Sequence, residues 1–539
     1  MPDGYSPFLR IPPFPGHKGG ALTRTGHSNI NVQEIAAAII AERVGGSFWG
    51  AQPDMDNNVI LLAPDSEDQL QAMMARLSRD QRSAAIAPGM HLPNHCQRLP
   101  VDCDPWHLAA SAREVWTGAN QEIALVASLS GVSMSLFGDG RFAGCDVTPE
   151  AALAEVVSGW RYISPFTCED WSPITAIAQL AAWRKLIDAN RKIDAVYGVA
   201  GWKRVTLDAM LWDGSRPVDY PRGFRSIRDT RQYQIVWKSR VASRLLAKLV
   251  NSGAHVGEIE DGFIRSVGLG ANCVPPLSTI VDFTGIYFDP NQESDLENIL
   301  QQDKFDEKLC RRAAALKNRL IEAEISKYGQ GRNDIKLTDI NRYKVLVAGQ
   351  VEDDRSICTG GAGMTNLELL ARARAHEPDA HIIYKPHPDV VAGHRKGHVE
   401  TTNALRFADE IQHNAAITSL IDAVDGVHVI TSLAGFEALL RGKAVTTHGV
   451  PFYAGWGLTK DLGAVPARRT RRLSLDELVA GTLLLYPRYT DPVTRLPCSA
   501  ELLVERMAQG EARISTPLIT LREWQGRLRL LLRSFIRRH

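Results

Sequence analysis

The chain has 539 residues, which at roughly 150 residues per domain predicts three or four domains. Apolar residues make up 44% of the chain and charged residues 23%, as is ordinary for a globular protein that can bury a large core. The net charge is only +1 and the sequence carries no RNA- or DNA-binding motif, so no nucleic-acid partner is expected.

Eight cysteines are scattered along the chain, and none forms a C-x-x-C pair. A chain of this size needs no covalent staples, so the pattern predicts free thiols rather than disulfides or a zinc site. The first 20 residues have no basic start followed by an apolar run, and no stretch of about 18 apolar residues occurs. A signal peptide and a membrane-spanning helix are therefore not expected, and the protein is predicted to be cytoplasmic.

The first part of the chain is predicted to be an N-terminal arm, 1–50, followed by a small α/β segment, 51–158. The arm begins with residues rich in Pro and Gly, which favour irregular structure. In the segment, apolar runs alternate with a helical pattern over 65–81 that Asp65 or Ser66 would cap. The strand-like runs are 58–64, 83–88, 113–118 and 132–138.

Two larger alternating regions follow. A loop and a long amphipathic helix over 158–192 indicate a linker into a domain at 159–335. Its predicted elements are strands 195–201, 233–239, 253–262 and 280–288, a helix at 239–253 and a charged helical stretch at 292–328. A further domain at 336–500 is predicted to contain strands 344–350, 380–386, 426–431 and 444–449 and helices 365–378 and 432–443. Residues 501–539 are expected to form a C-terminal helical segment. Such alternation predicts an α/β fold with parallel sheets covered on both faces.

An internal repeat relates the small segment to the later domain. Residues 125–145 resemble residues 436–456, and three glycines of each copy fall opposite one another: Gly131, Gly138 and Gly144 against Gly442, Gly449 and Gly455. Val126 stands opposite Glu437, and Pro88 and Gly89 stand near the position of the later Lys-Pro-His. The earlier copy is therefore predicted to be a degenerate Rossmann-like half-module that has kept the scaffold and lost the polar groups. Chance similarity between two α/β segments is the alternative.

Polar residues gather where strands of the later domain end. The stretches 349–356, 385–389 and 431–435 each follow a predicted strand of one sheet, and ligands of open parallel sheets bind beyond the carboxyl ends of the strands. Ser432 at a helix start, with Gly435 allowing close approach, suits an anionic group held by free N–H donors, although a simple helix cap explains Ser432 equally well. Lys385 and His387 add positive charge there. Together they predict a phosphate site that is not a P-loop.

Acidic residues end a strand of the preceding domain. Glu260 and Asp261 follow the strand-like run that begins at 253, and a cleft between two sheets would face them toward the phosphate site. A carboxylate that handles an acceptor proton opposite a leaving phosphate is typical of a sugar-nucleotide-dependent glycosyltransferase with two Rossmann-like domains. A solvated turn is the alternative for this pair. The acidic residues 351–354 suggest either a metal cluster or, more simply, an acidic loop at a helix start.

Eight stretches together resemble one protein family. "EDGFIRSVGLG", "PPLS", "GIYFDP", "SDLE", "GQVEDDRSI", "YKPHPDV", "TSLAGFEALLRGK" and "PFYAGWGLT" are similar to the capsule polysaccharide β-Kdo transferases of lipid-linked capsule assembly, over about residues 160–500. Long members of that family carry two tandem GT-B-like modules that use CMP-β-Kdo and build an oligo-Kdo linker on a lipid at the inner membrane. This sequence resembles such a protein with a complete second module and a first module reduced to its donor-side half.

The resemblance implies roles for individual residues. Transfer from CMP-β-Kdo to a β-Kdo product is retaining and requires a covalent glycosyl-enzyme, for which Asp354 is the expected nucleophile and Asp353 its nearest rival. Glu260 is the expected acid/base, and His387 is expected to be a catalytic residue as well as a donor-binding one. The donor-binding set comprises Lys385, His387, Ser432, Gly435, Glu437 and Gln350, and the acceptor-side set comprises Asp261 and Arg265. No metal or other cofactor is expected, and the second-module style of the motifs implies transfer to the 7-hydroxyl of Kdo.

The expected partners are CMP-Kdo, a lipid-linked oligo-Kdo acceptor, an anionic inner-membrane surface and other capsule assembly proteins. The tail 517–539 has a basic amphipathic pattern that suits a membrane surface, with a helix packed on the enzyme body as the alternative. Two other hypotheses remain for the whole protein. One is an inactive scaffold subunit of the capsule machinery, and the other is an inverting transferase of the CMP-sialic-acid type.

Overall fold

The computed structural model describes residues 6–514 apart from 57, 79, 228, 268–272, 328, 331–340 and 394. The chain forms two compact units. Unit 1 contains Met1–Ile193, Leu211–Val218 and Val493–Leu496, and unit 2 contains Asp194–Met210, Asp219–Pro492 and Pro497–His539. The linker helix expected to open the 159–335 domain therefore groups with unit 1. The predicted tail 517–539 lies outside the described residues.

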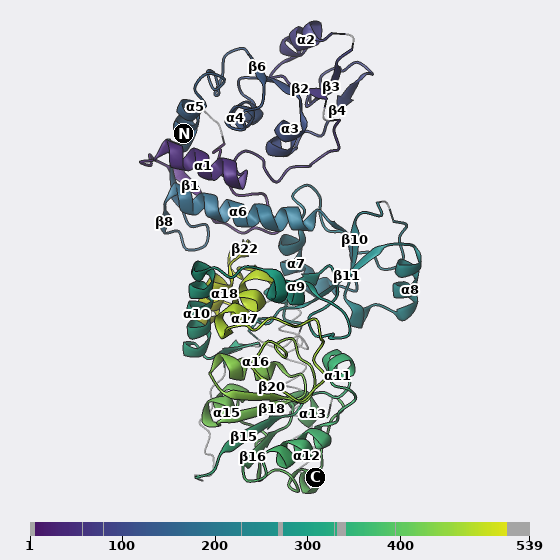
Figure 1. Cartoon of the computed structure of the whole chain (residues 1–539). Helices are drawn as coiled ribbons and strands as arrows, with labels where there is room; N and C mark the ends of the chain where they lie inside the picture. The colour runs from purple at the N-terminus through teal and green to yellow at the C-terminus, as the bar shows by residue number, and fades with distance from the viewer. Residues whose placement is uncertain are drawn as a thin grey trace, which may run out of the picture. The chain divides into compact units, whose positions relative to one another are not determined.

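Unit 1 is built around a five-stranded parallel sheet of order β4-β3-β2-β5-β6 (Figure 1). The strands are β2 (Val59–Ala63), β3 (Arg82–Ala85), β4 (Cys96–Arg98), β5 (Glu114–Gly118) and β6 (Met134–Phe137). The helices between and after them are α2 (Glu67–Arg76), α3 (Pro105–Ser111), α4 (Glu122–Leu129) and α5 (Pro149–Ser158). A small sheet of β1 (Thr23–Thr25), β7 (Trp160–Ile163) and β8 (Asp170–Trp171), with helices α1 (Val32–Glu42) and α6 (Pro173–Asn190), completes the unit.

Residues 6–22 of the N-terminal arm contain no helix or strand, as expected, whereas β1 and α1 lie further along it. The irregular part nevertheless contributes to the core of unit 1. Phe8 and Leu9 are fully buried, and the ring of Phe14 lies edge-on to Trp183 and Trp212 at centroid distances of 5.6 and 5.2 Å. Burial of these apolar side chains stabilises the packing of the arm against the rest of unit 1. The Pro- and Gly-rich composition of the arm does not predict this packing.

The first sheet of unit 2 has the order β22-β21-β12-β11-β10-β9 and is mixed. Its strands are β9 (Ile193–Tyr197), β10 (Tyr233–Val236), β11 (His255–Asp261), β12 (Ser278–Asp282), β21 (Arg488–Thr490) and β22 (Pro497–Cys498). The β10 and β11 strands are parallel, but β11 and β12 are antiparallel. The expectation of purely parallel sheets is therefore wrong here, because the hydrophobic pattern of a strand does not encode its direction.

The second sheet of unit 2 is parallel throughout, with the order β17-β16-β15-β18-β19-β20. Its strands are β15 (Lys344–Ala348), β16 (His381–Lys385), β17 (Glu410–Ile411), β18 (Gly426–Val429), β19 (Ala444–Thr447) and β20 (Lys460–Asp461). The helices are α11 (Arg355–Gly360), α12 (Asn366–His376), α13 (Pro388–Val391), α14 (Thr401–Ala404), α15 (Ile417–Ala423) and α16 (Leu433–Leu440). Val345 and Val347 pack with α12, whereas Leu346 and Ala348 pack in the cluster that contains α15 and α16. Both faces are thus covered, which confirms the α/β class.

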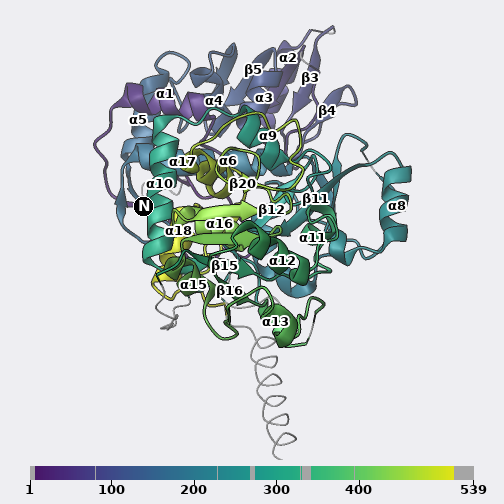
Figure 2. The ribbon, with the colours of Figure 1, turned by 60° about the horizontal axis from the view of Figure 1, so that its bottom comes forward.

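The remaining elements of unit 2 surround the two sheets. They are η1 (Gly201–Lys203), α7 (Arg204–Leu211), η2 (Lys238–Arg240), α8 (Ser243–Asn251), α9 (Asp295–Gln302), α10 (Glu307–Glu322), the hairpin β13 (Ile325–Ser326) and β14 (Gly329–Gln330), α17 (Leu475–Val479), the π-helical turn η4 (Ala480–Leu485) and α18 (Ala500–Ala508). The predicted helical stretch 292–328 is two helices, because Asp306 accepts a hydrogen bond from the Leu309 N–H and caps a new helix. Helix α8 packs against the sheet beside β10 and β11 (Figures 1 and 2).

The sheet of unit 1 and the second sheet of unit 2 share one topology. In both, the first strand lies between the second and the fourth, and the third and fifth lie outside them. Helices α4 and α16 are separated by the same 311 residues as the matched glycines of the sequence repeat. One hydrogen bond also recurs: the Asn120 N–H donates to Asp65 at 3.0 Å, as the Thr431 N–H donates to Gln350 at 2.8 Å. The repeat is therefore structural.

After the second sheet the chain returns to the first. Strand β21 pairs with β12, and β22 pairs with β21. The domain predicted at 336–500 includes these residues, but β21 and β22 belong to the first sheet of unit 2. Such an exchange of strands cannot be predicted from the alternation of strands and helices, because each element contributes the same local pattern whichever sheet it joins.

Candidate active site

Gln350 connects the loops that follow β15 and β18. Its side-chain oxygen accepts from the Thr431 N–H at 2.8 Å, and its amide nitrogen donates to the Thr431 hydroxyl at 3.2 Å. Its backbone N–H donates to Asn366 at 2.9 Å. Gln350 is buried, and Asp65 makes the corresponding hydrogen bond in unit 1. Because the bond recurs in both sheets, we interpret the contacts of Gln350 as structural: they fix the two loops relative to each other.

Asp354 lies at the start of α11, on the loop that Gln350 fixes. One carboxylate oxygen, Oδ1, accepts from the N–H and the hydroxyl of Ser356 at 3.0 and 2.7 Å, and that hydroxyl lies 3.3 Å from the Thr431 hydroxyl. The other oxygen has no hydrogen-bond donor among the described residues, and the residue is exposed. A carboxylate with one anchored and one open oxygen has the arrangement that a nucleophile needs.

Its acidic neighbours have other partners. Asp353 forms an exposed ion pair with Arg395 at 3.1 Å, and Glu352 accepts from the Asn366 N–H at 2.8 Å. Within the described ranges, no group of three or more His, Cys, Asp or Glu residues could hold a metal ion. The acidic stretch 351–354 is therefore a loop whose carboxylates point to separate partners.

Lys385 and His387 lie at the carboxyl end of β16. The ring nitrogen Nδ1 of His387 accepts from the Asp389 N–H at 3.2 Å, which places the proton of the neutral ring on Nε2. Burial lowers the pKa of His387, and the negative charges of Asp389 and Asp354 oppose this shift. The His387 ring therefore lies close enough to Asp354, the candidate nucleophile, to interact with its charge. Burial also lowers the pKa of Lys385, whose ammonium donates to the His413 carbonyl at 2.7 Å.

Glu260 and Asp261 end β11 and have opposite electrostatic environments. Burial raises the pKa of Glu260 to about 7, and the Asp261 carboxylate adds to that rise. Burial alone would also raise the pKa of Asp261, but Lys203 at 3.0 Å and Arg265 at 2.7 Å outweigh it and hold that pKa below its ordinary value. One carboxylate is fixed as an anion, and its neighbour can exchange a proton near neutral pH.

Arg265 and Lys203 belong to this charge cluster. Arg265 is 1% exposed and also donates to the Ser266 hydroxyl and the Val274 carbonyl, so its guanidinium is committed to the protein. Lys203 is a residue that the sequence analysis missed. Its ammonium lies 3.2 Å from the centroid of the Trp237 ring, and burial lowers its pKa to about 8 despite Asp261. A lone lysine after a strand gives no sequence signal for such a role.

The first turn of α16 is capped by Ser432, and the side chain of Tyr453 packs against it. The Ser432 hydroxyl accepts from the Ala434 N–H at 3.2 Å, and its carbonyl accepts from the Tyr453 hydroxyl at 2.5 Å. A Cβ on Gly435 would lie 2.2 Å from that same hydroxyl. The glycine therefore makes room for Tyr453, and the close approach expected of a ligand is made by a protein side chain.

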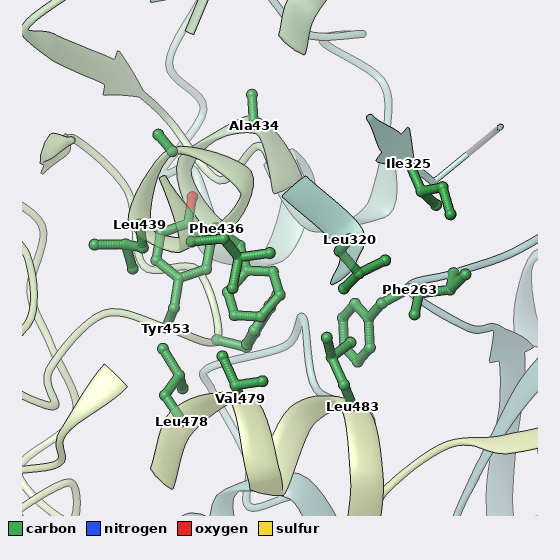
Figure 3. Close-up of a cluster of buried hydrophobic side chains, with 14 of the residues drawn as sticks. Phe263, Leu320, Ile325, Ala434, Phe436, Leu439, Tyr453, Leu478, Val479 and Leu483 are labelled. Atoms are coloured by element: carbon green, nitrogen blue, oxygen red, sulfur yellow. The ribbon is translucent and has the colours of Figure 1, made fainter. Parts of the chain in front are cut away.

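Glu437 lies on the inner face of α16. With Leu433, Phe436 and Leu440 it lines a small cavity. Phe263, Leu320 and Phe436, which also line this cavity, lie in the apolar cluster drawn in Figure 3. Burial raises the pKa of Glu437, and its carboxylate accepts from the Lys327 backbone N–H. The structure thus places Glu437 in the packing between α16 and the β13–β14 hairpin.

One ion cluster connects elements of the two sheets of unit 2. Glu258 of β11 accepts from the Lys238 ammonium at 2.7 Å and from the Arg355 guanidinium at 2.9 Å. Residues two apart on a strand share a face, so Glu258 and Glu260 point the same way. Arg355 follows Asp354 directly. The contact therefore brings the candidate nucleophile to the side of β11 that carries the candidate acid/base.

Comparisons with known proteins identify the family. The family model for the capsule polysaccharide biosynthesis protein matches residues 234–489. The capsule polysaccharide modification protein LipA of Neisseria meningitidis serogroup A is 51% identical over an alignment of 352 residues, with 63% of this chain and 49% of LipA covered. The chain thus spans about half the length of this relative.

Two solved structures of Thermosulfurimonas dismutans KpsC are also similar. The β-Kdo 2,4 transferase is 32% identical, with 58% of this chain and 98% of that one covered at a TM-score of 0.50. The β-Kdo 2,7 transferase is 34% identical, with 59% and 99% covered at a TM-score of 0.47. The similarity to the 2,4 transferase spans nearly the whole of that KpsC chain and, with the LipA match, confirms the resemblance inferred from the motifs. The chain belongs to the capsule polysaccharide biosynthesis family that contains the KpsC Kdo transferases.

Proposed function

We propose that the protein is a retaining glycosyltransferase that moves β-Kdo from CMP-β-Kdo to a Kdo-terminated, lipid-linked acceptor in capsule linker synthesis. The observation that carries this proposal is the pair of unlike carboxylates in unit 2. Asp354 has one anchored and one open oxygen, and Glu260 has a pKa raised to about 7. Retention by double displacement requires a nucleophile and a separate group that moves protons.

The proposed reaction has two displacements. In the first, the open oxygen of Asp354 attacks the anomeric carbon of Kdo, and the bond to the CMP phosphate breaks with its electron pair leaving on CMP. Lys385 and the Nε2–H of His387 offset the charge of that phosphate. In the second, an acceptor hydroxyl attacks the same carbon, Glu260 takes the hydroxyl proton, and the Asp354 ester bond breaks.

Finer parts of the proposal rest on the family motifs. The "GQVEDD" and "KPHPD" stretches favour the 7-hydroxyl of Kdo as the acceptor group. A lipid-linked acceptor implies action at the inner membrane from the cytoplasmic side, as a peripheral protein. No helix in the described ranges is both long and apolar enough to cross a bilayer. CMP-Kdo is the only small molecule that the proposed reaction requires besides the acceptor.

Incubation with CMP-β-Kdo and a soluble β-Kdo-terminated acceptor tests the proposal. The expected product contains one more β-Kdo residue, and NMR of its anomeric centre reports the configuration. An α-configured product would favour an inverting transferase of the CMP-sialic-acid type. No transfer to any Kdo-terminated acceptor, with CMP still bound, would favour an inactive scaffold.

Unit 1 is expected to bind no CMP, so one chain should bind one equivalent. The start of α4, which corresponds to the start of α16, carries Glu122, and Arg10 of the N-terminal arm forms a close ion pair with this carboxylate. Ile86 stands at the register of Lys385, and Val126 stands opposite Glu437. A phosphate at the start of α4 would therefore meet the Glu122 carboxylate, and the cation beside it, Arg10, is already paired with that carboxylate. Isothermal titration with CMP measures the stoichiometry, and a value of two would contradict this expectation.

A further inference from the structure

The cluster of Lys238, Glu258 and Arg355 carries more positive charge than its own carboxylate neutralises. The Glu258 side chain is 8% exposed, whereas Lys238 and Arg355 are 35% and 26% exposed. A buried carboxylate that holds two cations leaves a net charge of +1 at a position that solvent and solutes can reach. Each cation also keeps hydrogen-bond donors for another partner.

Those donors are open among the described residues. Arg355 donates to Glu258 through Nη2, and neither its Nε nor its Nη1 has an acceptor within the described part of the chain. Its guanidinium lies 4.8 Å from the centroid of the Phe288 ring, which together with Glu258 fixes its orientation. Lys238 has one acceptor for three N–H groups. A planar guanidinium held in place beside an ammonium suits a second carboxylate.

The cluster also lies where the proposed chemistry occurs. Lys238 follows the carboxyl end of β10, Glu258 shares a face of β11 with Glu260, and Arg355 follows Asp354. Kdo is a sugar acid whose carboxylate is attached to the anomeric carbon. When the Asp354 carboxylate approaches that carbon, two like charges come together, and a fixed cation nearby lowers the cost of their approach.

We infer that Lys238 and Arg355, oriented by Glu258, form a binding site for the carboxylate of an acid sugar. This inference rests on the proposed function and adds a substrate contact to it. The carboxylate belongs either to the Kdo of the donor or to the terminal Kdo of the acceptor, because both sugars carry it. The alternative role of the cluster is a purely structural ion pair between the two sheets.

Steady-state kinetics of Lys238→Gln and Arg355→Gln separate these roles. Each variant is expected to raise the KM of one substrate about 10- to 100-fold, as fits the loss of a charged hydrogen bond, with a smaller change in kcat. A raised KM for CMP-Kdo assigns the carboxylate to the donor, and a raised KM for the glycan assigns it to the acceptor. Lys238→Arg keeps the charge and should restore most of the affinity.

Arg240→Gln is the matched control. Arg240 lies in the same turn as Lys238, is exposed and forms no ion pair within the described residues, so its loss removes the same charge without touching the cluster. Equal KM changes in Arg240→Gln and Lys238→Gln would show a general charge effect and overturn the inference. Unchanged KM values in both cluster variants, or a loss confined to thermal stability, would overturn it as well.

A binding measurement separates failure of this inference from failure of the proposed function. Titration NMR compares β-Kdo methyl glycoside, an acceptor analogue, with its carboxamide. If the site holds the acceptor carboxylate, the wild-type protein should bind the acid at least about 10-fold more tightly, and Lys238→Gln should reduce that preference. The wild-type protein could transfer Kdo but show no preference for the acid, while the cluster variants keep the donor KM of the wild type. That result would overturn the carboxylate site and leave the proposed transferase function intact. Absence of both transfer and binding would overturn both.

Discussion

Asp354→Asn is expected to lower Kdo transfer by about 10⁴-fold or more while CMP binding stays close to that of the wild-type protein. The asparagine can still accept from Ser356 through its side-chain oxygen, so the loop should keep its shape. It cannot form the glycosyl ester. The charged groups expected at the phosphate, Lys385 and His387, lie on the separate loop after β16. Initial rates and a CMP titration on the same preparation measure both quantities.

Asp353→Asn is the control for this prediction. Asp353 precedes Asp354 but forms an exposed pair with Arg395, a kind of pair that typically contributes little to stability. Its loss should leave transfer within about threefold of the wild-type rate. Intact mass spectrometry with a slow acceptor should detect a Kdo adduct that peptide mapping places on Asp354. Near-normal turnover of Asp354→Asn, with loss in Asp353→Asn, would transfer the nucleophile assignment to Asp353.

Glu260→Gln is expected to lower transfer about 10²- to 10⁴-fold and to change its pH dependence. The pKa of Glu260 is raised to about 7, chiefly by burial and then by Asp261. A base must be ionised, so wild-type kcat should fall as the pH drops below about 7 and level off above it. Glutamine has no such titration, so the acidic limb should disappear from the residual activity. Stopped assays from pH 5.5 to 8.5 measure both profiles.

The surface variant Glu322→Gln controls for removal of a carboxylate as such, because the Glu322 side chain is 68% exposed at the end of α10. It should retain both the rate and the acidic limb. If Glu260→Gln kept the wild-type acidic limb, another group would be the base. A uniform loss of activity at every pH, accompanied by a lower melting temperature, would indicate a packing defect instead.

The sequence predicts the second sheet of unit 2 and its polar loops well, because both depend on local patterns. Continuous apolar strands followed by Asp354, Lys385 or Ser432 are visible in the chain without any tertiary information. The N-cap chemistry of Asp354 and Ser432 is local in the same way. The positions of these side chains at one edge of the sheet then follow from the parallel order of the strands.

Other features depend on contacts between distant segments and leave no local signal. Lys203 acquires its role only because the sheet brings it to Asp261, 58 residues later. Gly435 suggests a ligand contact, but Tyr453 occupies the space above it. Glu437 lies in a motif of polar residues, yet it packs against the β13–β14 hairpin. Gly435 and Glu437 are singled out by the sequence and Lys203 is not, and in all three cases the fold decides which group the residue contacts.

The return of the chain to the first sheet of unit 2 limits how the protein can be dissected. A fragment that stopped at residue 487 would lack β21 and β22, and β12 would lose its partner along Ser278 and Thr279. That strand is buried throughout, so its bared edge would be an apolar template for intermolecular pairing. Soluble halves are therefore better sought by excising the second sheet as an insertion between β12 and β21 than by cutting the chain in two.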